Sequence, residues 1–195
     1  MRILPALLML AASSAQAAPP DNVSPLKSQF TTIDLAACDV LRRDGRASVW
    51  SCSGLPGYRV YIAETVSSSG SKVAMSFGPK ADQQKAAAQT LDPSNSLYRD
   101  KRQRITVEWR HVRRNGRDLP YATIVRYFTK QGGARGQVLV VTRVGETEAC
   151  RMALIDALAN PSAIALARSI ADELARSFDC KGEPATYGAT GRSPM

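Results

Sequence analysis

A concentration of arginine in the middle of the chain is the first residue pattern that could bind a ligand. The basic residues near positions 105–110 and the turn that follows are Arg99, Lys101, Arg102, Arg104, Arg110, Arg113, Arg114 and Arg117. On a regular strand, residues of the same parity point to one face, and the arginines that share it are Arg102, Arg104, Arg110 and Arg114. Such a row can bind phosphates or carboxylates through paired hydrogen bonds. The same pattern fits a solvated face or a charged edge strand that resists aggregation, so both interpretations stay open.

Arg126 is a further candidate, because it interrupts the apolar alternation of Ala122, Ile124 and Phe128. A charged residue at such a position marks either a half-buried polar site or a sheet margin from which the side chain reaches solvent. The residues predicted to bind an anionic partner are therefore Arg102, Arg104, Arg110, Arg113, Arg114 and Arg126.

Catalytic chemistry has little support in the residue pattern. His111 is the only histidine, so any mechanism built on a Ser-His-Asp or Cys-His arrangement must use it, and no Gly-x-Ser-x-Gly motif accompanies it. Glu64, Glu108 and Asp156 could meet in space, but their dispersed positions give no positive evidence for a carboxylate pair. We predict no catalytic residues. The alternative is a small envelope hydrolase that uses His111 or a carboxylate pair.

Neither a metal nor a cofactor is predicted. A single histidine cannot build a zinc site alone, and the cysteines are better explained by disulfides. The glycine-rich stretches 54–57 and 132–136 do not end in the Gly-Lys-Ser/Thr of a phosphate loop, so both are interpreted as turns. Nucleic acid is not expected as a partner, because no aromatic series on one strand and no recognition-helix motif accompany the basic charge.

The cysteines of the chain, Cys38, Cys52, Cys150 and Cys180, are even in number and predict two disulfides in an oxidising compartment. Three pairings are possible. Cys38 and Cys52 are equally far from Gly45, so a hairpin with an odd-length loop centred there would place them opposite each other. We therefore expect the bonds Cys38–Cys52 and Cys150–Cys180. Both are interpreted as structural, because no Cys-x-x-Cys motif is present.

The second cysteine pair brackets a strand over residues 150–158 and a helix that is expected to begin at Asn160-Pro161. The apolar residues at helical spacing are Ile164, Ala167, Ile170, Ala171, Leu174 and Phe178, and those expected to face solvent are Ser169, Asp172, Glu173 and Arg176. A helix that folds back along the strand would bring Cys180 to Cys150.

Strand-like alternation dominates the region between these units. The predicted strands cover residues 58–66, 72–77, 105–110, 121–129 and 138–144. Asn115-Gly116 is a strong signal for a two-residue hairpin turn. A surface helix is also expected over residues 79–91. These elements predict an α+β fold, in which an antiparallel β-meander packs on a C-terminal α-helix and two disulfides staple the domain.

The N-terminal residues predict export. Arg2 precedes an apolar run, and Ala15-Gln16-Ala17 provides a small-residue cleavage site, so residues 1–17 are interpreted as a signal peptide. No later segment is long and apolar enough to span a membrane, so the mature chain is expected to be soluble and periplasmic or secreted. Residues 18–29 and 181–195 are expected to be flexible, and residues 30–180 to form a single domain.

Three parts of the chain resemble small secreted proteins of alphaproteobacteria. They are residues 52–61 (CSGLPGYRVY), residues 108–110 (EWR) and the region from 160–163 (NPSA) through 167–172 (ARSIAD) to 178–180 (FDC). The resemblance implies a periplasmic location but points to no known activity, so it assigns no functional residue. The formal net charge of +9 favours an anionic envelope component or an acidic protein as partner. We therefore predict an exported, non-catalytic protein of the bacterial envelope that binds such a partner through an Arg-rich surface.

Overall fold

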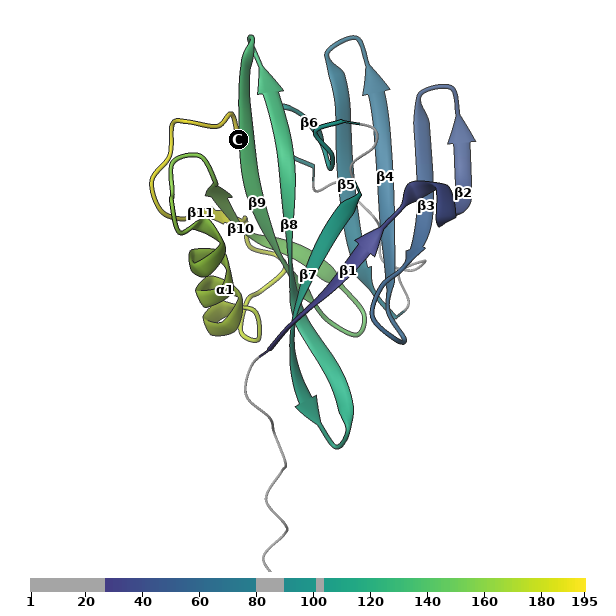
Figure 1. Cartoon of the computed structure of the whole chain (residues 1–195), viewed down its shortest axis with the longest axis vertical. Coiled ribbons are helices and arrows are strands. Elements are labelled where there is room, and N and C mark those ends of the chain that lie inside the picture. Colours follow the sequence, from purple (N-terminus) through teal and green to yellow (C-terminus); the bar gives the residue numbers. More distant parts are fainter. Residues whose placement is uncertain (1–26, 80–89, 101–103) are drawn as a thin grey trace, which may run out of the picture.

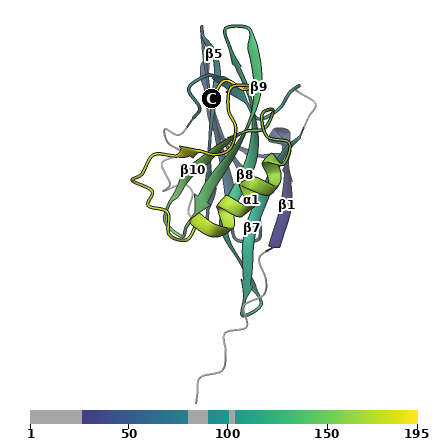
Figure 2. The ribbon, with the colours of Figure 1, turned by 90° about the vertical axis from the view of Figure 1, so that its left-hand side faces the viewer.

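The computed structural model describes residues 27–79, 90–100 and 104–195, and it has three layers (Figures 1 and 2). A seven-stranded sheet lies in the middle. A four-stranded sheet covers one of its faces, and helix α1 (Ala163–Leu174) covers part of the other. The predicted α+β class, the mostly antiparallel strands, the C-terminal helix and the two disulfides are confirmed. The strands expected in one meander are divided between two sheets.

The central sheet has the strand order β1-β7-β8-β9-β10-β11, and β6 pairs with β8. Its strands are β1 (Lys27–Ile33), β6 (Ser94–Ser96), β7 (Ile105–Arg114), β8 (Arg117–Gln131), β9 (Ala134–Val144), β10 (Ala149–Asp156) and β11 (Ala185–Thr186). The smaller sheet is a meander of β2 (Asp39–Asp44), β3 (Ala47–Ser53), β4 (Arg59–Ser67) and β5 (Gly70–Gly78). The short 3-10 helix η1 (Leu35–Ala37) connects the two sheets, because it leads from β1 into β2.

The middle position of the seven-stranded sheet explains the uninterrupted apolar run of β9. Val138 and Val140 belong to the core between the two sheets. Leu139 and Val141 belong to the core beneath α1. Successive side chains of a strand point to opposite faces, so a strand buried on both faces needs apolar residues at every position.

Trp109 is the centre of the core between the sheets, where its side chain is fully buried. Its ring makes edge-to-face contacts with Phe77, at a centroid distance of 5.6 Å, and with Tyr58, at 6.1 Å. The indole N–H donates a hydrogen bond of 2.8 Å to Thr31 Oγ1. Gly54 passes so close to this ring that an added Cβ would lie 2.7 Å from a ring carbon, so the Gly-rich stretch serves packing as well as turning.

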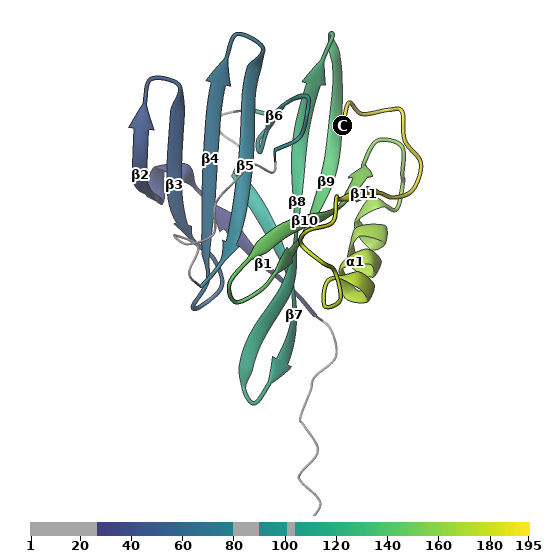
Figure 3. The same cartoon turned by 180° about the vertical axis from the view of Figure 1, so that it is seen from behind.

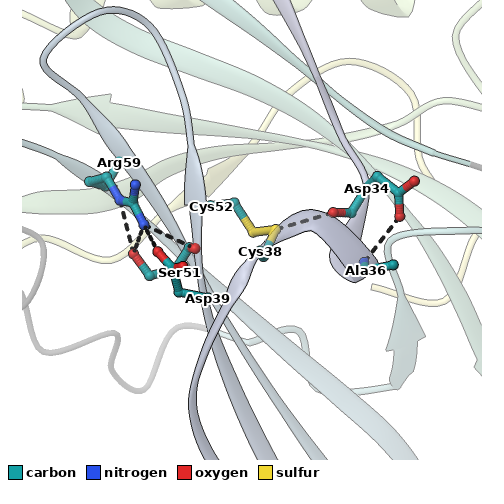
Figure 4. The surroundings of a disulfide bond; sticks show 7 residues. All are labelled: Asp34, Ala36, Cys38, Asp39, Ser51, Cys52 and Arg59. Carbon is teal, nitrogen blue, oxygen red and sulfur yellow. Dashed lines mark hydrogen bonds and ion pairs between the residues drawn. A yellow bond between two sulfur atoms is a disulfide. The ribbon is translucent and has the colours of Figure 1, made fainter.

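Cys38 and Cys52 form the predicted disulfide, with Cα atoms 4.6 Å apart (Figure 4). The turn between them differs from the one expected. Asp44 pairs with Ala47 across a two-residue turn, and the register then shifts by one residue at Leu41. This β-bulge restores the register in which Cys38 faces Cys52. The pairing is therefore reached through a bulge and not through an odd-length loop.

Asn115 and Gly116 form the predicted two-residue turn between β7 and β8. Their φ angles of 50° and 75° lie in the left-handed region that this kind of hairpin turn requires at both central positions. The pairing of β7 with β8 also has a bulge at Tyr121, beside Arg110. Past this bulge, β8 pairs regularly with β9 as far as Gln131.

Helix α1 buries mainly small side chains, which let its backbone approach the sheet closely; they include Ala163, Ala167 and Ala171, together with Ile170. The helix begins at Ala163, two residues later than expected. Asn160, which was predicted to cap it, donates instead to the backbone carbonyls of Asp156, at 2.8 Å, and Ala189, at 2.7 Å. Its amide therefore joins two loops and does not cap the helix.

The Cys150–Cys180 disulfide joins β10 to the segment after α1, as predicted, with Cα atoms 5.6 Å apart. Arg143 on β9 reinforces this junction. Its guanidinium donates to the carbonyl of Ala175, at 3.1 Å, and to Glu148, at 3.0 Å. The C-terminal end of the helix is thus fixed to the sheet by a covalent bond and by a charged side chain.

Residues 181–195 were predicted to be flexible, but in the structure this C-terminal segment contacts the sheets. Asp156, fully buried at the end of β10, accepts hydrogen bonds of 2.8 Å from the backbone N–H groups of Arg192 and Ser193. The Ser193 hydroxyl donates to the same carboxylate at 2.6 Å. Burial opposes ionisation of Asp156, but these hydrogen bonds outweigh it and its pKa is lowered. At the other end, residues 27–29 belong to β1 and not to a flexible leader.

Some predictions fall on other parts of the chain. The proposed signal peptide, residues 1–17, lies outside the described residues, as do Arg102 and most of the helix predicted over residues 79–91. Within the described part of the chain, none of the helices combines the length and apolar character needed to cross a membrane.

Candidate functional site

The structure does not bring the predicted arginines together. Arg110 is buried, Arg126 is half-buried, and the exposed members are Arg104, Arg113 and Arg114. Arg104 and Arg113 each lie 4.0 Å from a carboxylate oxygen, that of Asp34 and that of Asp118 respectively. Arg110 and Arg114 do share a face of β7, but helix α1 packs over Arg110 and leaves Arg114 exposed.

Arg110 is paired with helix α1. Its Nε and Nη2 donate to the two carboxylate oxygens of Asp172, at 2.9 and 2.6 Å. The Tyr121 hydroxyl donates to the same carboxylate at 2.6 Å, and the Arg176 guanidinium lies 5.2 Å from the centre of the Tyr121 ring. Asp172 is half-buried and faces the sheet, so the prediction that it faces solvent is wrong. Arg176 is exposed, as predicted, although its guanidinium also packs over the Tyr121 ring.

Glu108 extends this network to the N-terminal strand. Arg168 on α1 donates to both carboxylate oxygens of Glu108, at 2.6 and 3.2 Å. The Ser28 hydroxyl donates to Glu108 and accepts from Arg110 at 2.6 Å. The network therefore ties β1, β7 and α1 together. Arg110, which the sequence places in a binding surface, here has a structural contact.

The pKa values within the network follow from these contacts. The hydrogen bond to Asp172 is the main reason that the pKa of Arg110 is raised. Burial opposes ionisation of Asp172, but hydrogen bonds from Arg110 and Tyr121 and the charges of Arg110 and Arg176 outweigh it, so its pKa is lowered. Burial, followed by the bond to Asp172, raises the pKa of Tyr121 to about 12. Both partners of the ion pair are thus held in their charged forms at neutral pH.

The residues considered for catalysis do not converge on one site, although Glu108 and His111 both lie on β7. His111 is buried, with its Nδ1 3.4 Å from Asp118 Oδ1, and alternation along β7 directs it away from the face of Glu108. Glu64 lies on β4 in the smaller sheet, and Asp156 is occupied by the C-terminal segment. Across residues 27–79, 90–100 and 104–195, no cluster of three or more His, Cys, Asp or Glu side chains could hold a metal ion.

A pocket of about 470 Å³, here called the basic pocket, opens where β6, β8 and β9 meet. Its lining includes the cations Arg99, Lys130 and Arg135, the polar residues Ser94, Ser96 and Gln137, and the apolar residues Phe128 and Leu158. No acidic side chain occurs among the described residues that line it. Its volume falls within the range of about 300–1,000 Å³ that is usual for small-ligand sites.

Strand register places two of these cations side by side. Lys130, near the end of β8, pairs with Arg135 on β9 and with Ser94 on β6. Residues directly opposite each other in an antiparallel sheet share a face, so these three side chains point to the same side. Two cations on neighbouring strands repel each other when no anion lies between them, and an anionic ligand would remove that repulsion.

The apolar part of the basic pocket lies on the same face. Phe128, two residues before Lys130, pairs with Gln137 on β9 and with Ser96 on β6. Ile124 shares this parity and packs under α1, so the basic pocket and the helix lie on the same face of the central sheet. The β8–β9 hairpin extends beyond the helix (Figure 1).

Arg99, which lines the basic pocket, and Arg126, which lies next to it, add to its positive charge. The Arg99 guanidinium lies over the Phe128 ring, 5.5 Å from its centre. Arg126 lies on the same face of β8 and donates a hydrogen bond of 2.8 Å to Gln137 Oε1. Burial, and then the charge of Arg99, lower the pKa of Arg126.

Of the arginines predicted from the sequence, Arg126 lies next to this site: it is half-buried and donates to Gln137, which lines the basic pocket. The sequence does not point to the lining cations Lys130 and Arg135. Arg135 falls in the glycine-rich stretch 132–136 interpreted as a turn, and Lys130 lies between that stretch and the predicted strand 121–129. The alternation of Arg126, Phe128 and Lys130 was the signal that could have linked the turn to the site.

In comparisons with protein-family models, with curated proteins and with solved structures, no match to this chain was found. The chemistry of the basic pocket is therefore the basis for the function proposed below.

Proposed function

We propose that the protein is an exported, non-catalytic protein of the bacterial envelope that binds an anionic ligand in the basic pocket. The observation that carries this proposal is the convergence of Arg99, Lys130 and Arg135, from three separate segments, on one pocket whose described lining contains no acid. Guanidinium and ammonium groups in a partly enclosed site interact with phosphate, sulfate or carboxylate more strongly than they do on an open surface.

The covalent framework supports an extracytoplasmic location. Disulfides persist in oxidising compartments and are rare in the cytosol, and both cysteine pairs of this chain are bonded. Together with the proposed signal peptide over residues 1–17, this supports a periplasmic or secreted protein. Anionic components of the envelope, or acidic proteins in it, would then be within reach.

The proposal is tested by elution from immobilised heparin, a sulfated polyanion, in a sodium chloride gradient. The variant Lys130→Ser/Arg135→Ser should elute at clearly lower salt than the unmodified protein. Each cation–anion contact that is lost means about one counterion fewer released on binding. The slope of log affinity against log salt concentration should therefore become shallower by about two.

The matched control is Arg113→Ser/Arg117→Ser, which removes the same charge at the far end of β8. Both residues are exposed near the β7–β8 turn, at the end of β8 opposite the basic pocket. This control should retain nearly all the affinity of the unmodified protein. If both variants lost the same amount of heparin affinity, net charge alone would drive binding. If the unmodified protein were not retained on heparin at all, the proposal would be contradicted.

A further inference from the structure

A second hollow adjoins the basic pocket. It has a volume of about 540 Å³ and lies between the tips of the β4–β5 and β8–β9 hairpins. Its lining includes Ser69, Lys72, Asp92 and Gln131. These hairpin tips lie at the same end of the molecule with β6 between them, as Figures 1 and 3 both show.

The two hollows share Ser94 and Lys130, so they meet at the pair that joins β6 to β8. Ser94 is fixed at this junction, because its hydroxyl donates to the carbonyl of Ser71 at 3.1 Å. A Cβ on Gly70 would lie 2.4 Å from the same hydroxyl, so the close approach of β5 to β6 depends on that glycine. The result is one groove, with Lys130 in the middle and a hollow on each side.

The groove is lined by both charged and neutral polar groups. Cations occur along its whole length, at Arg99 and Arg135 in the basic pocket, Lys130 at the junction and Lys72 in the second hollow. Asp92 is the one acidic side chain among the described residues that line either hollow. Neutral polar residues line both hollows as well, among them Ser69, Ser94, Asn95, Ser96, Gln131 and Gln137.

We infer that this groove binds an acidic oligosaccharide long enough to occupy both hollows. A compact anion would need only the cations of the basic pocket, whereas neutral hydroxyl and amide groups suit a ligand that carries its own hydroxyls between its charges. The half-buried Tyr98 adds apolar surface on which the C–H face of a sugar ring can pack, whereas the Phe128 ring is already covered by Arg99. This inference rests on the proposed function, because it names the chemical class of the anionic ligand.

The test is calorimetric titration of the protein with heparin-derived oligosaccharides, from disaccharide to octasaccharide. The affinity for the octasaccharide should exceed that for the disaccharide at least about tenfold, because two occupied hollows act as linked sites. Lys72→Ser should weaken octasaccharide binding about three- to tenfold and leave disaccharide binding unchanged. Lys130→Ser should weaken both, and Arg117→Ser, an exposed residue at the opposite end, should weaken neither.

The outcomes separate this inference from the proposed function. If oligosaccharides of every length bind and depend on Arg135 but not on Lys72, the ligand occupies one hollow and the inference is overturned. If linear polyphosphate of matched charge binds as tightly as the octasaccharide, the hydroxyl groups are irrelevant and the ligand is not a saccharide. If neither probe binds, the proposed function itself fails.

Discussion

Replacing Asp172 by asparagine should lower the free energy of unfolding by about 3 kcal/mol, measured by urea denaturation. The variant leaves Arg110, whose side chain is only 9% exposed, without the carboxylate that neutralises it. Removing one partner of a buried ion pair is costly because the other charge stays desolvated. The Tyr121 hydroxyl, which donates to the same carboxylate, keeps only a neutral amide oxygen as its acceptor. This is among the largest effects that we expect from a single substitution in the chain.

A double-mutant cycle separates this explanation from a simple packing defect. Arg110→Met alone should be similarly destabilising, but Arg110→Met with Asp172→Leu should recover most of the loss, since no buried charge then remains. Losses that add in the double variant would contradict the explanation. The control is Asp39→Asn, which breaks an exposed ion pair of 2.6 Å with Arg59 (Figure 4). It should cost less than about 1 kcal/mol.

The same ion pair predicts how stability responds to acid. The pKa of Asp172 is lower in the folded protein than in the unfolded chain, where aspartate titrates near about 3.9. The stabilisation that ionised Asp172 gives the folded protein is therefore complete above about pH 5, and it is lost as the pH falls through the folded-state pKa. The free energy of unfolding of Asp172→Asn should consequently depend less on pH below about pH 4 than that of the unmodified protein.

Removing the Cys150–Cys180 disulfide should lower the free energy of unfolding by about 3–4 kcal/mol. The variant Cys150→Ala/Cys180→Ala frees a loop of sequence separation 30, which increases the conformational entropy of the unfolded chain. The first disulfide, with a separation of 14, should cost slightly less by the same reasoning. Urea denaturation of each variant under oxidising conditions measures the difference.

The two cysteine variants should also differ in where they loosen the protein. Cys180 follows α1, so its loss should raise amide hydrogen exchange in the helix and in the segment after it. Loss of the Cys38–Cys52 bond should affect β2 and β3 and leave the helix protected. A destabilisation below about 1 kcal/mol for both pairs, or identical exchange patterns, would contradict this assignment of separate roles.

The Cys38–Cys52 pairing was predicted correctly, but the geometry that was expected to produce it differs from the observed one. Equal spacing from Gly45 identified Cys38 and Cys52 as opposite residues, and they are. The sequence offers no visible signal for the bulge at Leu41 that makes the two-residue turn compatible with this register. Asn115-Gly116, by contrast, was predictable in full, because the left-handed φ angles of its turn are a local property of those residues.

The arginine row shows what alternation cannot reveal. Parity correctly indicates which face of β7 carries Arg110, but not that α1 would cover this face. Its partner Asp172 is 62 residues away in the sequence, on helix α1. The sequence alone does not determine which side of this helix faces the sheet at Asp172. Buried ion pairs across such separations depend on tertiary packing.

The basic pocket was predictable only in part for a similar reason. Arg126 and Lys130 lie on one strand, and alternation alone places them on one face. Arg135 joins them through the β8–β9 register, which a Gly-Gly turn makes plausible from sequence. The three-residue strand β6, which supplies Ser94 and the junction of the groove, is too short for any periodic pattern.

The location of a bound anion tests the central claim most directly. We would follow backbone amide NMR signals during titration with a heparin tetrasaccharide at moderate salt. If the basic pocket is the site, the signals that shift will cluster in residues 94–99 and 128–137, and those of residues 111–118 will stay in place. Shifts concentrated at the exposed arginines of the β7–β8 turn, with residues 128–137 unaffected, would contradict the assignment of function to the basic pocket.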